Sequence, residues 1–412
     1  RENPLARRDA FWCAYLHLSY EASVVVRRLI DAAIKLPLNQ MGSGVLERWS
    51  VLLSWFTAAA DRRVADRATR ALARILEQQP DVIVGVVERF LGCDDDAVSE
   101  RVLLAAYGAL ILTRDVPALR RLSGILCGAF RDRGAHFDNA LIRDHIRCVL
   151  ELSEHLEALP KDCSPASVVQ AVSADWPLTV SDDEQIEKWS EVARFRPDEF
   201  YSDFFKYSMR CLQPWNHAMQ KSDMGKWILQ RIARDFGYVG SNCEIYDVQM
   251  LRQYGPGRAK PVWAERIGKK YQWIAMYQLA SRLHDHVARQ RDSWEQEPLC
   301  LPLILLEERK LDPTLPPELP ESSEENNTSA WWITVSPDLD TDRQYSDAEW
   351  IFREDDLPEL RALLSTVEHG GQIWRLLVSD MSWKTPKHGG NREYPYRYIW
   401  MDIESFLVRK ED

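Results

Sequence analysis

The sequence predicts a mainly α-helical protein in which an α-solenoid of paired helices is followed by a helical middle region and a small α+β module. Three observations lead to this fold class: helical repeats near the N-terminus, a rise in tryptophan content after residue 160, and strand-like runs after residue 330. The predicted boundaries are 1–160 for the solenoid, 161–310 for the middle region, 311–330 for a linker or exposed loop, and 331–412 for the module.

The repeat is the observation with the most detail. Val64–Leu72 (VADRATRAL) and Val98–Ala106 (VSERVLLAA) share valine, acid, arginine and alanine 34 residues apart, and a looser copy begins near Leu141. Turn signals at Gln79–Asp81 and Arg114–Pro117 divide the first two copies into pairs of apolar helices. A single pair cannot bury its apolar stripe, so neighbouring pairs must stack. The pattern resembles a HEAT-like solenoid of at least three helix pairs.

Further helices are expected from apolar periodicity and from capping residues. Acid or asparagine caps are predicted at Asp81, Asp115, Asp138 and Asn139. Earlier helical patterns cover Ala10–Ala33 and Val45–Ala59, and later ones are a helix capped by Asp223 that ends near Gly237 and a long amphipathic helix at Val262–Arg291.

The C-terminal module is predicted from short strand-like runs around one helix. The strands are expected at Trp331–Val335, Glu349–Phe352 and Gln372–Val378, and the helix at Leu357–Ser365. Its dense tryptophans could line a recognition pocket, but the area that aromatic side chains bury favours a role in the core.

Charge and cysteine usage narrow the function classes. The net charge of −11 argues against broad phosphate binding and leaves a local basic face open. The eight cysteines are scattered without a C-x-x-C pair, which favours free thiols in a reducing cytosol over a disulfide framework or structural zinc. The most apolar stretch, Val102–Thr113, is shorter than the roughly 20 residues of a membrane span. We therefore expect a cytoplasmic protein that does not engage membranes. The first residue, Arg1, suggests a piece of a longer polypeptide.

A stretch between residues 252 and 273 alternates cations with aromatic side chains. The candidate binding residues are Arg252, Arg258, Lys260, Trp263, Arg266, Lys269, Lys270, Tyr271 and Trp273. Such alternation lets proteins stack bases and contact phosphates. The alternative is an ordinary helix whose aromatics pack inward while Arg266, Lys269 and Lys270 sit in water. The rarity of functional patches favours this second interpretation.

Two further clusters invite a chemical interpretation that their spacing does not favour. His284, Asp285 and His286 could hold a metal, but residues two apart on a helix point to different faces, so a plain helix surface is favoured. Asp144 and His145 look like half of a catalytic dyad, yet they occupy the repeat position of Arg67 and Arg101, which indicates a scaffold role. Phosphate-loop, dinucleotide and nucleophile-elbow motifs do not occur. We therefore expect no catalytic residue, metal or cofactor.

One run carries a family resemblance. Glu265–Leu283 (ERIGKKYQWIAMYQLASRL) resembles a segment of large bacterial ATP-binding proteins of the STAND class, which are associated with antiphage defence. Similar segments there follow helical repeats like Arg67–Arg74 and Glu100–Gly108 and precede runs like Arg309–Thr314 and Trp331–Trp332. The resemblance implies an oligomeric parent protein whose NTPase responds when this region senses a ligand. It transfers no catalytic residue.

Three functions remain open from the sequence. The first is a non-catalytic recognition region for a protein ligand, of which a phage component is one example. The second is a nucleic-acid-binding HEAT-repeat protein, similar to HEAT-type DNA glycosylases, that uses the 252–273 patch. The third is an unrecognised enzyme in residues 166–412, which a deep pocket at Glu265, Arg266 or His284 would favour.

Overall fold

The computed structural model describes the chain in two compact units, Arg1–Leu319 and Pro320–Asp412. The described residues are 4–21, 25–133, 138–169, 176–194, 204, 208–244, 246–247, 266–288, 311–314 and 346–353, with strand backbone at 366–369, 372–375, 378–386 and 396–404. This part of the chain is mainly α-helical. The first unit includes both regions that the sequence separated at residue 160, and the second begins inside the predicted 311–330 segment.

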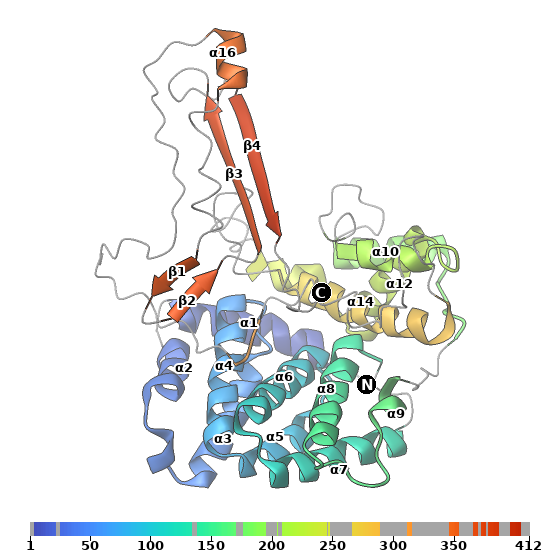
Figure 1. The fold of residues 1–412 in the computed structure, drawn as a ribbon. Coiled ribbons are helices and arrows are strands. Elements are labelled where there is room, and N and C mark those ends of the chain that lie inside the picture. The colour runs from blue at the N-terminus through green and yellow to red at the C-terminus, as the bar shows by residue number, and fades with distance from the viewer. Residues whose placement is uncertain are drawn as a thin grey trace. The chain divides into compact units, whose positions relative to one another are not determined.

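The N-terminal helices of the first unit alternate between two layers (Figure 1). One layer contains α2 (Val25–Lys35), α4 (Arg62–Gln78), α6 (Asp96–Thr113) and α8 (Ala140–His155). The other contains α3 (Ser43–Phe56), α5 (Asp81–Phe90) and α7 (Val116–Arg133). Helix α1 (Pro4–Glu21) packs on α2 and α4, the turn η1 (Leu38–Gln40) precedes α3, and α9 (Pro165–Val169) packs on α8. The turns predicted near residues 80 and 115 separate α4 from α5 and α6 from α7.

The layers stack because each helix has an apolar stripe that its neighbours cover. On α4 the side chains of Val64, Ala68, Leu72 and Ile75 are completely buried. They join a hydrophobic cluster that runs from Leu16 to Val168. Burial of a valine, leucine or isoleucine side chain is worth about 1.5–3 kcal/mol, so the stacked stripes stabilise the fold.

The acid–arginine pair of the repeat motif joins successive helices of one layer. Arg101 on α6 lies 2.8 Å from Asp66 on α4, and Arg67 on α4 lies 2.5 Å from Asp31 on α2. In the third copy His145 Nε2 lies 2.9 Å from Glu100 Oε1 on α6. The motif therefore encodes an ion-pair ladder between neighbouring repeats. His145 makes the corresponding contact in the third copy, as its repeat position predicts.

A second hydrophobic cluster holds the rest of the first unit together. Its elements are α10 (Asp183–Ala193), η2 (Ser208–Trp215), α12 (Lys221–Gln230), the π-helical turn η3 (Arg231–Asp235) and α14 (Ile267–His286). Helix α14 contacts α1, α6, α8 and α12. The predicted helix is confirmed over this range, but it is buried around nearly its whole circumference, so the prediction that it is amphipathic is wrong. The ends of the predicted range, 262–265 and 289–291, lie outside the described residues.

The predicted caps are confirmed at two helices and wrong at two others. Asp115 Oδ1 accepts the backbone N–H of Ala118 at 2.7 Å, and Asn139 Oδ1 accepts that of Leu141 at 3.0 Å. By contrast, Asp81 and Asp223 lie inside the first turns of α5 and α12. There an acidic side chain interacts favourably with the positive end of the helix dipole but does not cap the helix.

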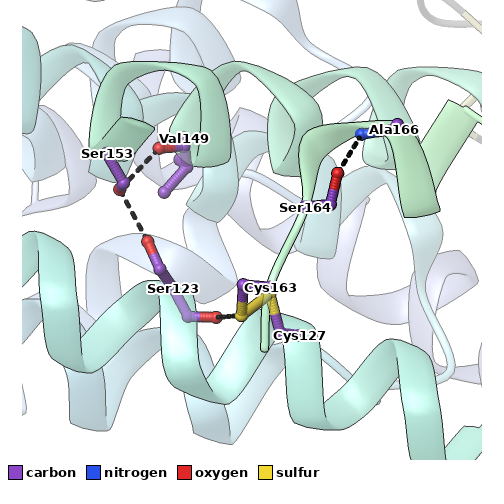
Figure 2. Close-up of a disulfide and its surroundings, with 7 residues drawn as sticks. All are labelled: Ser123, Cys127, Val149, Ser153, Cys163, Ser164 and Ala166. Carbon is purple, nitrogen blue, oxygen red and sulfur yellow. Dashed lines mark hydrogen bonds between the residues drawn. A yellow bond between two sulfur atoms is a disulfide. The ribbon is translucent and has the colours of Figure 1, made fainter. Parts of the chain in front are cut away.

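The cysteines include one disulfide, so the prediction of free thiols is wrong for this pair. Cys127 on α7 is bonded to Cys163, which precedes α9, with 5.9 Å between their Cα atoms (Figure 2). The segment after α8 folds back onto α7, a contact that scattered spacing in the sequence does not reveal. Five other described cysteines do not form a disulfide: Cys13, Cys93, Cys148, Cys211 and Cys243.

The second unit contains a short helix and two antiparallel hairpins among its described residues. They are α16 (Asp347–Phe352), β1 (Thr366–His369) paired with β2 (Gln372–Arg375), and β3 (Val378–Pro386) paired with β4 (Tyr396–Glu404). The register places Val367 opposite Trp374 and Ser382 opposite Trp400.

The strand predictions for this unit have mixed outcomes. The run at Glu349–Phe352 is helical, because Ser346 and Glu349 form a reciprocal capping box that starts α16. The run at 372–378 is confirmed in part, since it covers β2 and the first residue of β3. The predicted strand at 331–335 and helix at 357–365 lie outside the described residues.

Candidate functional site

A pocket of about 420 Å³ lies where α14 passes the N-terminal ends of α4, α6 and α8. Its walls include Arg62 from α4, Glu100 and Arg101 from α6, and Trp273 and Tyr277 from α14. The volume falls in the range of roughly 300–1,000 Å³ that is common for small-molecule sites.

Lys270, at the base of this pocket, is almost completely buried and uses all three of its N–H donors. Its Nζ donates to Asp9 Oδ2 at 2.7 Å, to Asp95 Oδ2 at 2.7 Å and to the Ala58 carbonyl at 3.0 Å. Only 7% of the Lys270 side chain is exposed, and both carboxylates are completely buried. Lys270 therefore ties α14 to α1, to the end of α3 and to the start of α6.

Two more side chains complete this buried cluster. Arg8 Nη2 donates to Asp9 Oδ1 at 2.7 Å and to Asp95 Oδ2, and the Tyr271 hydroxyl donates to Asp9 Oδ2 at 2.9 Å. Two carboxylates thus face two cations, and the cluster is neutral. Buried charges are tolerated only when they are paired and hydrogen-bonded in this way.

The pKa values of three groups in this cluster are shifted away from neutral pH. Burial alone would raise the pKa of Asp95, but the charges of Lys270 and Arg8 outweigh it and hold that pKa below its usual value. Burial would lower the pKa of Lys270, but Asp9 and Asp95 outweigh it and raise that pKa. Burial and the charge of Asp9 also raise the pKa of Tyr271 well above its usual range. Near neutral pH these three groups keep one protonation state, which suits a structural lock and not proton transfer.

The three helices that start at the pocket are capped by their own side chains. Asp61 and Asp95, 34 residues apart, cap α4 and α6 by accepting the N–H of Arg63 at 3.0 Å and of Ala97 at 3.1 Å. Asn139 caps α8 in the same way. Because these caps already occupy the first free N–H groups, the helix ends do not present an open anion site.

The pocket lining combines aromatic and charged side chains. On α14, the rings of Trp273 and Tyr277 stack with 5.8 Å between centroids and 25° between planes. On α6, Arg101 lies 2.8 Å from Asp66 and 3.3 Å from Glu100. Such a site suits a ligand with an apolar or aromatic part and a polar edge.

Comparison with protein-family models, with curated proteins and with solved structures gives no match to this chain. Function is therefore argued from the geometry. Within the described ranges, no helix combines the length and the apolar content needed to cross a lipid bilayer.

The structure separates the candidate residues of the 252–273 stretch. Lys269, Lys270 and Trp273 line the pocket, whereas Arg266 is the exposed N-cap residue of α14 and lies outside its lining. The interpretation that places Lys270 in water is wrong, because this face of α14 meets buried carboxylates. Tyr271 is fully buried and cannot stack on a base. The remaining four, Arg252, Arg258, Lys260 and Trp263, lie outside the described residues.

The prediction that the histidines near the end of α14 form a plain helix surface is wrong. Asp285 accepts two hydrogen bonds from Arg143 on α8, at 2.7 and 2.9 Å, and His286 stacks on Trp176 with centroids 5.1 Å apart. Burial lowers the pKa of His284. The described residues contain no group of three or more potential metal ligands. These side chains join α14 to its neighbours.

Sequence reasoning missed Asp9, Asp95 and Arg8, which complete the buried cluster. One signal was available for Asp95, since it stands 34 residues after Asp61 at the repeat period. The thiol of Cys13 is also buried, and this burial raises its pKa and makes it a poor nucleophile. Asp144 and His145 do not form a dyad, because Asp144 accepts from Arg147 while His145 meets Glu100.

Proposed function

We propose that this chain is a non-catalytic recognition region of a larger bacterial protein and that its ligand is a protein. In this proposal the alternating layers are a HEAT-like α-solenoid, and α14 closes its inner layer to form the ligand pocket. The parent would be an oligomeric STAND-type ATP-binding protein of antiphage defence, the class that residues 265–283 resemble. The observation that carries the proposal is the pocket at the junction of α14 with three repeat helices.

The state of the charged groups at the pocket favours binding over catalysis. Arg101 is held by Asp66 and Glu100, and Lys270 by Asp9 and Asp95. A general acid or base works best with a pKa near the working pH, but the pKa of Lys270 is raised and that of Asp95 is lowered. Fixed, paired side chains instead give a preorganised surface, which lowers the entropy cost of binding.

A pair of substitutions on α6 tests the proposal. Ala97 lines the pocket and is half-buried, so Ala97→Trp should fill part of the pocket. Leu112, on the same helix, is 49% exposed, and Leu112→Trp is the matched control. Both variants are first compared with the wild type in thermal unfolding, so that a misfolded protein is recognised.

The readout is co-precipitation of proteins from phage-infected bacteria by the wild-type chain and by each variant. We expect a specific protein to be retained by the wild type and by Leu112→Trp and to be lost with Ala97→Trp. Recovery of the same proteins with all three chains, or of none by a folded wild type, would argue against recognition through this pocket.

A further inference from the structure

A short segment of the first unit lies against the repeat helices beside the pocket. Pro313 packs on α6 at Gly108, and the Asp312 carbonyl accepts a hydrogen bond from Arg70 Nε on α4 at 3.4 Å. Leu311, at the start of the segment, lines the pocket. Residues 311–314 therefore follow the face of α4 and α6 as a bound peptide would.

Gly108 makes room for the proline ring. A Cβ at this position would lie 2.8 Å from Pro313 Cγ and 2.9 Å from Pro313 Cβ, which is too close for either atom. Glycine inside a helix costs about 1 kcal/mol relative to alanine. On α7, by comparison, a Cβ at Gly124 or Gly128 would meet nothing within 4 Å. The absence of a side chain at Gly108 on α6 thus leaves the space that the Pro313 ring occupies.

The segment is preorganised for this contact. Asp312 Oδ1 accepts the Thr314 backbone N–H at 2.8 Å and the Thr314 hydroxyl at 2.6 Å, which forms an Asx turn. Proline fixes its own φ angle, so little backbone entropy remains to be lost. An aliphatic anchor, a turn-forming aspartate and a proline together make a compact recognition element.

The contact is also small. It is made by four described residues, Asp312 is exposed, and the hydrogen bond from Arg70 is long and exposed. Because the segment belongs to the same chain, it occupies this face at an effective concentration of the order of millimolar. A partner segment with the same chemistry can therefore compete with it.

We propose that the face of α4 and α6 around Gly108 is a docking site for a protein segment with an aliphatic residue followed by aspartate and proline. Leu311–Thr314 is its internal occupant, which the partner displaces. This inference rests on the proposed recognition function and specifies the chemistry of its protein ligand.

The test uses the full chain and a fluorescent peptide that spans residues 307–318. The internal occupant is weakened with the double substitution Leu311→Ser and Pro313→Gly, and binding is followed by fluorescence anisotropy. We expect this variant to bind the peptide at least tenfold more tightly than the wild type does. Addition of Gly108→Ala should weaken binding at least tenfold, although alanine favours the helix. Gly124→Ala, the matched control, should leave binding unchanged.

Two results would overturn the docking site: no saturable binding of the peptide to the variant with the weakened occupant, or binding that Gly108→Ala leaves intact. A peptide of the same composition, in which the aspartate and the proline are moved to other positions, serves as the specificity control. Failure of this proposal is distinguishable from failure of the recognition function. In the first case the peptide does not bind while co-precipitation still depends on Ala97, and in the second co-precipitation shows no such dependence.

Discussion

Asp61 and Asp95 occupy the same position in consecutive repeats, but their carboxylates have different partners. Both are completely buried, and both cap a helix through the backbone N–H two residues ahead. Asp61 is also bonded to His17 on α1 and to its near neighbour Arg63. Asp95 is instead bonded to Arg8 on α1 and to Lys270 on α14.

The difference shows how one repeat position acquires a second role. At Asp61 the cap and its partners belong to the beginning of the chain, so the interaction stabilises the stack itself. At Asp95 one partner lies 175 residues away, and the same lysine also holds Asp9. The second repeat thereby becomes the attachment point of α14, and the pocket forms beside it. Stability of the fold and shape of the pocket are coupled there.

The largest effect is expected from Lys270→Ala. Without this lysine, Asp9 and Asp95 share a single cation, Arg8, and a negative charge remains buried without its counter-ion. Breaking such a buried pair costs about 3–5 kcal/mol, to be measured as the free energy of unfolding in urea. The adjacent Lys269 is only half-buried, so Lys269→Ala should cost less than about 1 kcal/mol. Equal losses would contradict the structural role of Lys270.

A smaller loss is expected from His17→Ala, the corresponding change at Asp61. Here the carboxylate keeps Arg63, whose Nη2 donates to Asp61 Oδ2 at 2.7 Å, so no buried charge is left alone. The lost hydrogen bond and the space left by the ring together cost about 2 kcal/mol. The same urea titration measures it. A loss larger than that of Lys270→Ala would reverse the order of the two sites.

The sequence predicts the helices of the first unit well because their determinants are local. The apolar stripe of α4, the turns near residues 80 and 115, and the caps at Asp115 and Asn139 all follow from residues within a few positions of one another. The capping box of Ser346 and Glu349 was equally local, but the apolar run after it suggested a strand. Because this run is helical, the capping box here outweighs the apolar periodicity of a run of only four residues.

The site could be predicted only in part. Lys269, Lys270 and Trp273 line the pocket. The alternation of cations and aromatic residues therefore indicated the correct part of α14. The burial of Lys270 could not be predicted, because its partners lie 261 and 175 residues away and helical spacing alone gives it a solvated position. The disulfide between Cys127 and Cys163 could not be predicted because the spacing of the cysteines does not show that the segment after α8 folds back onto α7.

The pH dependence of stability should report on both aspartates. Burial alone would raise the pKa of Asp61, but hydrogen bonds from His17 and Arg63 lower it, and the pKa of Asp95 is lowered by Lys270 and Arg8. A carboxylate with a lowered folded-state pKa stabilises the fold above its unfolded-state pKa of about 3.9. This contribution is lost as the pH falls through the folded-state pKa.

We therefore expect the free energy of unfolding to fall as the pH drops below about 4. Asp61→Asn should make this decline shallower, because asparagine still caps α4 but no longer titrates. Asp81→Asn, at an exposed residue, should leave the slope unchanged. A decline that Asp61→Asn leaves as steep as in the wild type, measured by urea unfolding between pH 7 and pH 3, would contradict the direction assigned to Asp61.

The smallest effect is expected from Arg121→Ala, which tests whether burial is what separates Asp95 from other acids at helix starts. Asp81 lies in the first turn of α5 and pairs with Arg121 at 2.6 Å, but these side chains are 77% and 49% exposed. Water and salt screen such a pair, so its loss should cost less than about 0.5 kcal/mol. A cost close to that of Lys270→Ala would mean that distance alone sets the strength of these contacts. A small cost that shrinks further at high salt would assign the difference to the exclusion of water around Asp95.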